Sequence, residues 1–185
     1  ARSKNASGFV AGELFVGNGL DGQIVRISPD GMTVQNPWVD LPGGGNGLMR
    51  GSLYVDHAGI FGGDLIAVTT VGQVWRITAA GVPTMLAAVG VHLEGLAIVP
   101  DAPLRYGPLA GKIIAGAEGQ SLLYAFDKDG KFSTYNVGVA IEDIDLILPN
   151  ENFFGVNFGT GKLLGASADN FKNMVGDIML TREVN

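Results

Sequence analysis

The chain has 185 residues and a mass of 19.2 kDa, with 46% hydrophobic and 16% charged residues, which excludes an intrinsically disordered chain because enough apolar surface is present to offset the ordering entropy. A net charge of −6 without any long Lys/Arg cluster excludes the phosphate backbone of nucleic acids as a favoured partner. The absence of cysteine excludes disulfide bonds, thiolate metal sites and a cysteine nucleophile.

No segment of the sequence is long and apolar enough to predict a membrane span. The longest mostly apolar stretch, residues 82–91, contains Pro83 and Thr84 and is far shorter than the roughly 20 residues that a membrane helix needs. No charged and then apolar signal sequence opens the chain. We expect a secreted, periplasmic or cell-surface protein in its mature form.

A repeat with a period of about 48 residues runs along the chain. In chain order, the first expected strand of each unit begins at Asn46-Gly47-Leu48, Glu94-Gly95-Leu96 and Glu142-Asp143-Ile144. The second expected strand opens on a glycine, at 12–17, 63–68 and 111–116, with a less regular match at 161–166. The third ends in a turn signal, at 23–31, 73–81 and 122–130, and a weaker fourth strand follows at 32–39, 83–89 and 131–137.

Four short strands per unit, separated by Gly, Pro and Asp turns and without an amphipathic helix, are typical of propeller blades. We therefore predict an all-β fold, a β-propeller of about four blade units in one domain, at 8–45, 46–93, 94–141 and 142–185. A β-sandwich or another barrel is the alternative, although neither predicts so long a period. A β-solenoid is a further alternative whose repeats are normally shorter.

The ends of the repeat leave two interpretations of the propeller open. The first unit begins at its second strand, and the fourth unit runs out near residues 177–183. Segment 176–181 supplies the missing strand and closes a four-bladed ring, or it opens a further blade and the chain is a fragment of a larger propeller. In the second case, unpaired blade edges favour self-association.

Three polar residues share one position of the repeat and are candidate ligands of a metal ion. Asn46, Glu94 and Glu142 start the first strands, which converge at the axis if those strands line the central channel. Carboxylates forced together repel each other unless a proton or a cation joins them. Oxygen ligands favour calcium or magnesium over zinc, with Asp143 or Asp145, backbone carbonyls and waters completing the shell. The alternative is that each acid caps its own turn without an ion.

The run from Glu94 to Asp101, EGLAIVPD, and less closely Asn46-Gly47-Leu48, resembles the inner-strand motif of calcium-dependent propellers. These are the gluconolactonase and paraoxonase group, the esterase-like region associated with phytases, and NHL-type repeats. The run GQIVRISPDG that ends at Gly31 is similar to their blades. The resemblance implies a channel calcium on Glu94, Glu142 and Asn46 that polarises a substrate, although those enzymes have more blades.

Two further features are candidates for a function. His92 lies two residues before Glu94, where it is a candidate general base beside a metal or, alternatively, a hydrogen-bonded surface residue. The loop 99–111 contains three prolines and is the longest connection that departs from the repeat. Because loops on a rigid scaffold often carry recognition, its Arg105 and Tyr106 are a candidate ligand-binding rim.

We expect a non-catalytic extracellular or periplasmic binding or structural module, with calcium as the ion of a channel site. Its ligand is a glycan, a peptide or a small molecule, and neither nucleic acid nor a membrane span is expected. A metal-dependent hydrolase of lactones or esters is the first alternative, with His92 activating water. A self-associating surface or matrix subunit is the second.

Overall fold

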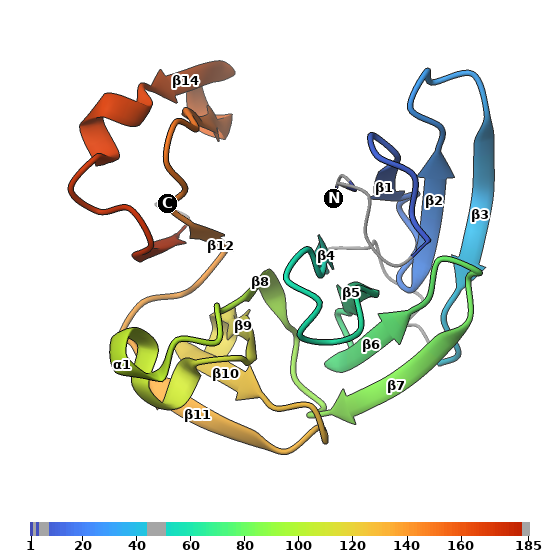
Figure 1. The fold of residues 1–185 in the computed structure, drawn as a ribbon, viewed down its shortest axis with the longest axis horizontal. Helices are drawn as coiled ribbons and strands as arrows, with labels where there is room; N and C mark the ends of the chain where they lie inside the picture. Colours follow the sequence, from blue (N-terminus) through green and yellow to red (C-terminus); the bar gives the residue numbers. More distant parts are fainter. Residues whose placement is uncertain (2, 4–7, 44–50, 183–185) are drawn as a thin grey trace.

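The computed structural model describes residues 1, 3, 8–43 and 51–182. Antiparallel sheets follow one another in chain order along an arc, as Figure 1 shows. None of the helices within the described residues is long and apolar enough to cross a membrane. The described part of the chain is mostly β-structure in several small antiparallel sheets, as the sequence predicted, with a few short helices between strands.

The first unit forms a sheet of order β1-β2-β3, with β1 at Leu14–Gly17, β2 at Gln23–Ile27 and β3 at Val34–Asp40. The backbone of two residues before it runs along β1. Phe15 N donates to Ala1 O over 2.8 Å, and Ser3 N donates to Glu13 O over 3.0 Å. The position of an inner strand, expected to be absent from this unit, is therefore held by Ala1 and Ser3.

The second and third units are four-stranded antiparallel meanders. The second contains β4 (Leu53–Val55), β5 (Leu65–Val68), β6 (Gln73–Ile77) and β7 (Pro83–Ala88). The third contains β8 (Glu94–Ile98), β9 (Ile113–Ala117), β10 (Leu122–Phe126) and β11 (Phe132–Asn136). Short helices α1 (Pro103–Tyr106) and η1 (Gly107–Leu109) lie between β8 and β9, and η2 (Glu118–Gln120) follows β9.

The strands form where the sequence supplies apolar runs closed by side-chain-capped turns. Strands β5 and β9 are buried along their whole length, which suits their uninterrupted runs of residues without a polar side chain. The turn after β10 is fixed by Asp127, whose Oδ1 accepts hydrogen bonds from the backbone N–H groups of Asp129 and Lys131.

Apolar clusters between consecutive units hold the arc together. One joins Phe15 and Ile24 of the first unit to Leu65 and Trp75 of the second. Two more clusters are built in the same way, one between the second and third units and one between the third and fourth. The sheets of the second and third units each contribute one face to the cluster before them and the other face to the cluster after them. The first of these two clusters contains Ile66, Val68, Val74, Leu96, Ile113 and Tyr124, and the second contains Ala97, Ile114, Leu123, Ala125, Ile141 and Ile144.

The fourth unit differs from the other three. Strand β12 (Asp143–Leu146) pairs with β15 (Ile178–Thr181), and β13 (Phe153–Asn157) pairs with β14 (Lys162–Ala166) as a separate hairpin. The register Leu146↔Ile178 repeats Ile98↔Ile113 of the third unit. The second strand of this unit is therefore β15, and the expectation that residues 161–166 hold that position is wrong. The short helices η3 (Phe158–Thr160) and η4 (Ala168–Phe171) flank β14.

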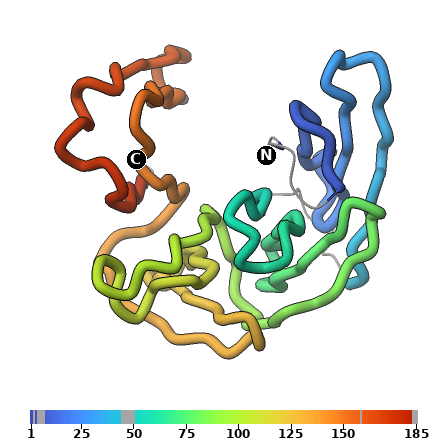
Figure 2. Tube along the Cα trace, in the orientation of Figure 1, coloured from blue at the N-terminus to red at the C-terminus, as the bar shows by residue number. Residues whose placement is uncertain are grey.

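The sheets of the first and fourth units stand at opposite ends of the arc (Figure 2). Among the described residues, no strand of one pairs with a strand of the other. Segment 176–181 pairs with β12 instead, so it does not close a four-bladed ring.

Candidate functional site

Three carboxyl groups and one imidazole gather at the N-terminal end of β8. Glu94 is the first residue of β8, His92 lies two residues before it, Glu118 opens η2 directly after β9, and Glu142 directly precedes β12. Strands β8 and β9 are antiparallel, with Glu94 opposite Gly116, so the end of β9 returns to the start of β8. This pairing places Glu118 beside Glu94. We call these four residues the carboxylate cluster.

Glycines let the third and fourth units approach closely enough to assemble the carboxylate cluster. Gly95 has a φ of +58°, and a Cβ there would lie 2.9 Å from Ile144 Cγ1 and 3.0 Å from the backbone of Asp143. A Cβ at Gly116 would lie 2.6 Å from the Ile141 side chain. A larger residue at either position would push β12, and Glu142 with it, away from β8.

Ligating atoms of His92, Glu94 and Glu118 all lie within 4.8 Å of one another. His92 Nε2 lies 2.9 Å from Glu94 Oε1. These two atoms are close but lack the alignment of a hydrogen bond, and Nε2 is a buried atom with no hydrogen-bond partner in the described structure. A buried polar atom without a hydrogen bond is costly, and an imidazole nitrogen beside carboxylates has the features of a metal ligand.

Glu142 joins the carboxylate cluster from the fourth unit. The pKa of Glu142 is raised from 4.5 to about 7, first by burial. Hydrogen bonding and charge repulsion from Glu94, and then from Glu118, supply the rest of this rise. Carboxyl groups can hydrogen-bond to each other only when one of them holds a proton. In the cation-free protein, Glu142 therefore keeps a proton up to near-neutral pH, and a cation would take the place of that proton.

The structure brings some of the predicted site residues together and not others. Glu94, Glu142 and His92 lie in the carboxylate cluster. Asp143 is exposed and accepts the N–H of Ile144 over 2.9 Å, and its side chain lines a different surface. Asn46 lies outside the described residues, and β4 begins at Leu53.

Glu118 was not among the predicted ligands. Its signal in the sequence was the pairing of neighbouring strands: the end of the second strand, at Ala117, must lie beside the start of the first strand, at Glu94. The repeat comparison considered only the starts of first strands and missed it.

The polar groups of the predicted binding rim bind the fourth unit. Arg105 Nη2 donates to Val175 O over 2.5 Å and to Asp177 Oδ1 over 3.2 Å, and Tyr106 Oη donates to Gly176 O over 2.8 Å. These hydrogen bonds join the loop between β8 and β9, which contains α1, to the turn that precedes β15.

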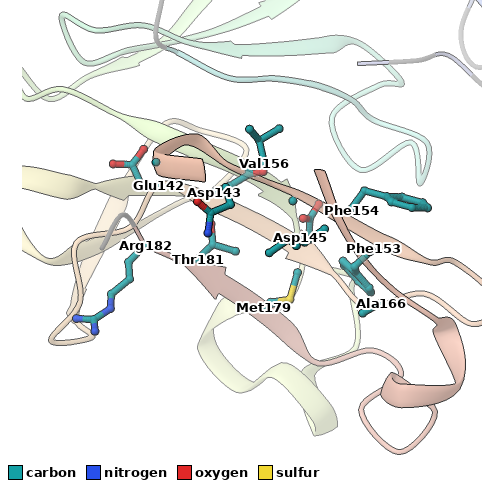
Figure 3. Close-up of a pocket in the computed structure, with 15 residues that line it drawn as sticks. Glu142, Asp143, Asp145, Phe153, Phe154, Val156, Ala166, Met179, Thr181 and Arg182 are labelled. Carbon is teal, nitrogen blue, oxygen red and sulfur yellow. The ribbon is translucent and has the colours of Figure 1, made fainter. Parts of the chain in front are cut away.

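A groove of about 970 Å³ lies in the fourth unit, between the β12–β15 sheet and the β13–β14 hairpin (Figure 3). The residues that line it include Glu142, Asp143, Asp145, Phe154, Val156 and Met179. Because Glu142 belongs to both, the unit-four groove opens beside the carboxylate cluster.

No protein-family model and no curated protein matches the sequence. Among solved structures, virginiamycin B lyase from Staphylococcus aureus shares 14% identity, with 94% of this chain and 55% of that chain covered and a TM-score of 0.51. A streptogramin B lyase shares 14% identity over 92% of this chain and 54% of that chain, with a TM-score of 0.52. Dihydro-heme d1 dehydrogenase NirN shares 15% identity, with 85% of this chain and 31% of that chain covered and a TM-score of 0.53.

These neighbours are β-propellers, and the likeness shows a fold of the propeller type. The chain spans little more than half the length of the lyase chains. At such low identity the likeness shows the fold alone, and the narrower resemblance to calcium-dependent propellers stays a prediction.

Proposed function

We propose that this chain is a non-catalytic, divalent-cation-binding propeller module whose ion joins the third and fourth units. The observation that carries the proposal is the composition of the carboxylate cluster: Glu94, Glu118 and His92 come from the third unit and Glu142 from the fourth. An ion on these groups would relieve the repulsion among the carboxylates and link β8 to the start of β12.

The chemistry of the ligands decides which cations to test. Carboxylates suit calcium, magnesium and manganese, whereas an imidazole nitrogen suits zinc and other transition metals. Calcium was expected from an oxygen-only set, but His92 adds a nitrogen ligand. Manganese or zinc, which accept both kinds of ligand, are therefore the favoured ions, and calcium competes with them in the same experiment.

Thermal unfolding of the EDTA-treated chain, with each cation added in turn, tests the proposal. An ion that binds only the native state at about 100 times its Kd stabilises it by about 2.7 kcal/mol. We expect such a rise in the melting temperature for the wild type, and a loss of the rise in Glu94→Gln and Glu118→Gln. Calorimetric titration of the same variants measures the affinity directly.

Asp129→Asn is the matched control, because Asp129 is an exposed acid in the same unit and lies outside the carboxylate cluster. This variant should keep the full cation response. An equal response in Glu94→Gln and the wild type, or no response to any cation, would contradict the proposal and leave the acids as hydrogen-bonding groups.

A second candidate function, a metal-dependent hydrolase of lactones or esters, is favoured by one observation. Glu142 lines the unit-four groove, so the carbonyl of a bound substrate could approach an ion held by the carboxylate cluster. A screen of lactones and esters with the cation-loaded chain tests it. Turnover that disappears in Glu142→Gln and His92→Gln, with folding unchanged, would favour this candidate over the binding module.

A further inference from the structure

The unit-four groove lies on the face of β12 that points away from the third unit. Ile144 packs in the core between the third and fourth units, so Asp143 and Asp145, which alternate with it, lie on the opposite face. Met179 and Thr181 of β15 lie on the same face, and the β13–β14 hairpin stands over it (Figure 3).

The repeat shows that this face departs from the chemistry of the other units. The pairs Tyr54↔Ile66, Ala97↔Ile114 and Asp145↔Met179 occupy equivalent positions in the second, third and fourth units. In the second and third units both members pack in the cores between units. Asp145 thus places a carboxylate where the second and third units have Tyr54 and Ala97, which pack in those cores. Covering Asp145 with another apolar face would cost the desolvation of a charge.

The hairpin supplies an apolar wall opposite these acids. Phe154, Val156 and Leu164 line the unit-four groove, and their exposed fractions are 68%, 75% and 55%. Large apolar side chains this exposed on one surface mark a binding site more often than isolated ones do. The volume of the groove, about 970 Å³, is in the range of small-molecule sites.

The charge of the groove selects the kind of ligand. Partial burial raises the pKa of Asp145, and the carboxylates of Asp143 and Glu151 raise it further, although solvent still reaches the Asp145 side chain. Glu142, Asp143 and Asp145 line the groove with one basic residue, Arg182, so acids predominate. A second copy of the chain, with a net charge of −6, would add like charge.

We propose that the unit-four groove binds an amphipathic organic cation of small-molecule size, with its ammonium or guanidinium group on Asp143 and Asp145 and its apolar body against Phe154, Val156 and Leu164. The acids would supply charge-assisted hydrogen bonds and the hairpin would supply apolar burial. The ligand needs no metal ion, so this inference is independent of the proposed cation site.

Calorimetric titration in EDTA at pH 7.5 with 2-phenylethylamine tests the proposal, with 3-phenylpropionate as the anionic analogue and 2-phenylethanol as the neutral one. We expect the amine to bind at least about tenfold more tightly than either analogue, which corresponds to one charge-assisted contact. Asp145→Asn should weaken the amine about tenfold, and Phe154→Ala should weaken the amine and the alcohol to a similar degree. Asp129→Asn, an exposed acid outside the groove, should change nothing.

Two results would overturn the proposal. One is the absence of amine binding, or binding that Asp145→Asn leaves unchanged. The other is a doubled mass in light scattering that Phe154→Ala returns to the monomer, which would assign the face to a second copy. Because EDTA is present throughout, neither result bears on the cation site.

Discussion

Arg26 of the first unit donates a hydrogen bond from Nη1 to the carbonyl oxygen of Ala79 in the second unit, over 3.1 Å. The same guanidinium holds Glu13 Oε1 through Nε at 2.9 Å and Nη2 at 2.6 Å. Arg76 repeats the ion pair with Asp64, but its remaining bond, to Phe61 O, stays within the second unit. The pair is thus a repeated device, and in the first unit it also couples neighbouring sheets.

Replacing Arg26 should destabilise the protein. Arg26→Ala leaves Glu13, a buried residue at 6% exposure, without the guanidinium and removes the bond to Ala79. Hydrogen bonds to charged groups contribute about 1.5–3 kcal/mol each, so we expect a loss of about 3 kcal/mol in the free energy of unfolding by urea denaturation. Glu13→Gln in the Arg26→Ala background should recover part of that loss. No recovery would contradict the role of the buried charge.

The stability of the cation-free protein should fall as the pH rises. The pKa of Glu142 is about 7 in the folded chain and 4.5 in the reference state, so the folded chain binds more protons between these values. In EDTA, the contribution of Glu142 to the free energy of unfolding is therefore fully present below pH 4.5, and this contribution is lost as the pH rises through about 7. Melting curves from pH 4.5 to 8 check it, and Glu142→Gln should flatten the profile. An equally steep profile in that variant would contradict the assignment.

The contacts of Arg105 and Tyr106 predict a structural effect of their removal. Tyr106→Phe loses one hydrogen bond to Gly176 O, and we expect a loss of about 1 kcal/mol. Gly176→Ala should cost more, because Gly176 has a φ of +84° and a Cβ there would lie 2.5 Å from the Arg105 guanidinium. Denaturant unfolding measures both. A Tyr106→Phe variant with unchanged stability would return this residue to the ligand-binding rim predicted from the sequence.

Asp56 organises the loop between β4 and β5. It is 0% exposed, and its carboxylate accepts hydrogen bonds from the N–H groups of Ile60, Phe61 and Gly63. Asp56→Ala would leave these donors without their carboxylate acceptor, and two of the three lost hydrogen bonds are buried. We expect the free energy of unfolding to fall by about 3 kcal/mol or more. His57→Ala, at the exposed neighbouring position, is the control and should change stability little. Equal effects of the two variants would contradict this role.

The sequence was sufficient for the second and third units because apolar runs and turn signals repeat there in step with the strands. It was not sufficient for the fourth unit. Residues 161–166 and 176–181 both combine a glycine, a charged residue and an apolar run, and local pattern cannot rank them. Burial against the third unit decides which segment pairs with β12. Ile178 and Leu180 pack on the core of the third unit, whereas Leu163 and Leu164 are exposed at 68% and 55%.

The candidate site was predictable as far as it follows the repeat. Glu94 and Glu142 share a repeat position, and close packing of β8 and β12 brings them together. Glu118 depends on strand pairing rather than on the repeat, and the departure of Asp145 from an apolar position becomes visible only when the registers of the three sheets are compared.

The pairing of β12 with β15 has a kinetic consequence. In the second and third units each strand pairs with its neighbour in sequence, but in the fourth an entire hairpin separates the two partners. Closing the longer loop costs more chain entropy before any contact is gained, and non-local pairing slows folding. We therefore expect the fourth unit to acquire its native sheet last during refolding, and its backbone amides to exchange with deuterium before those of β5 and β9.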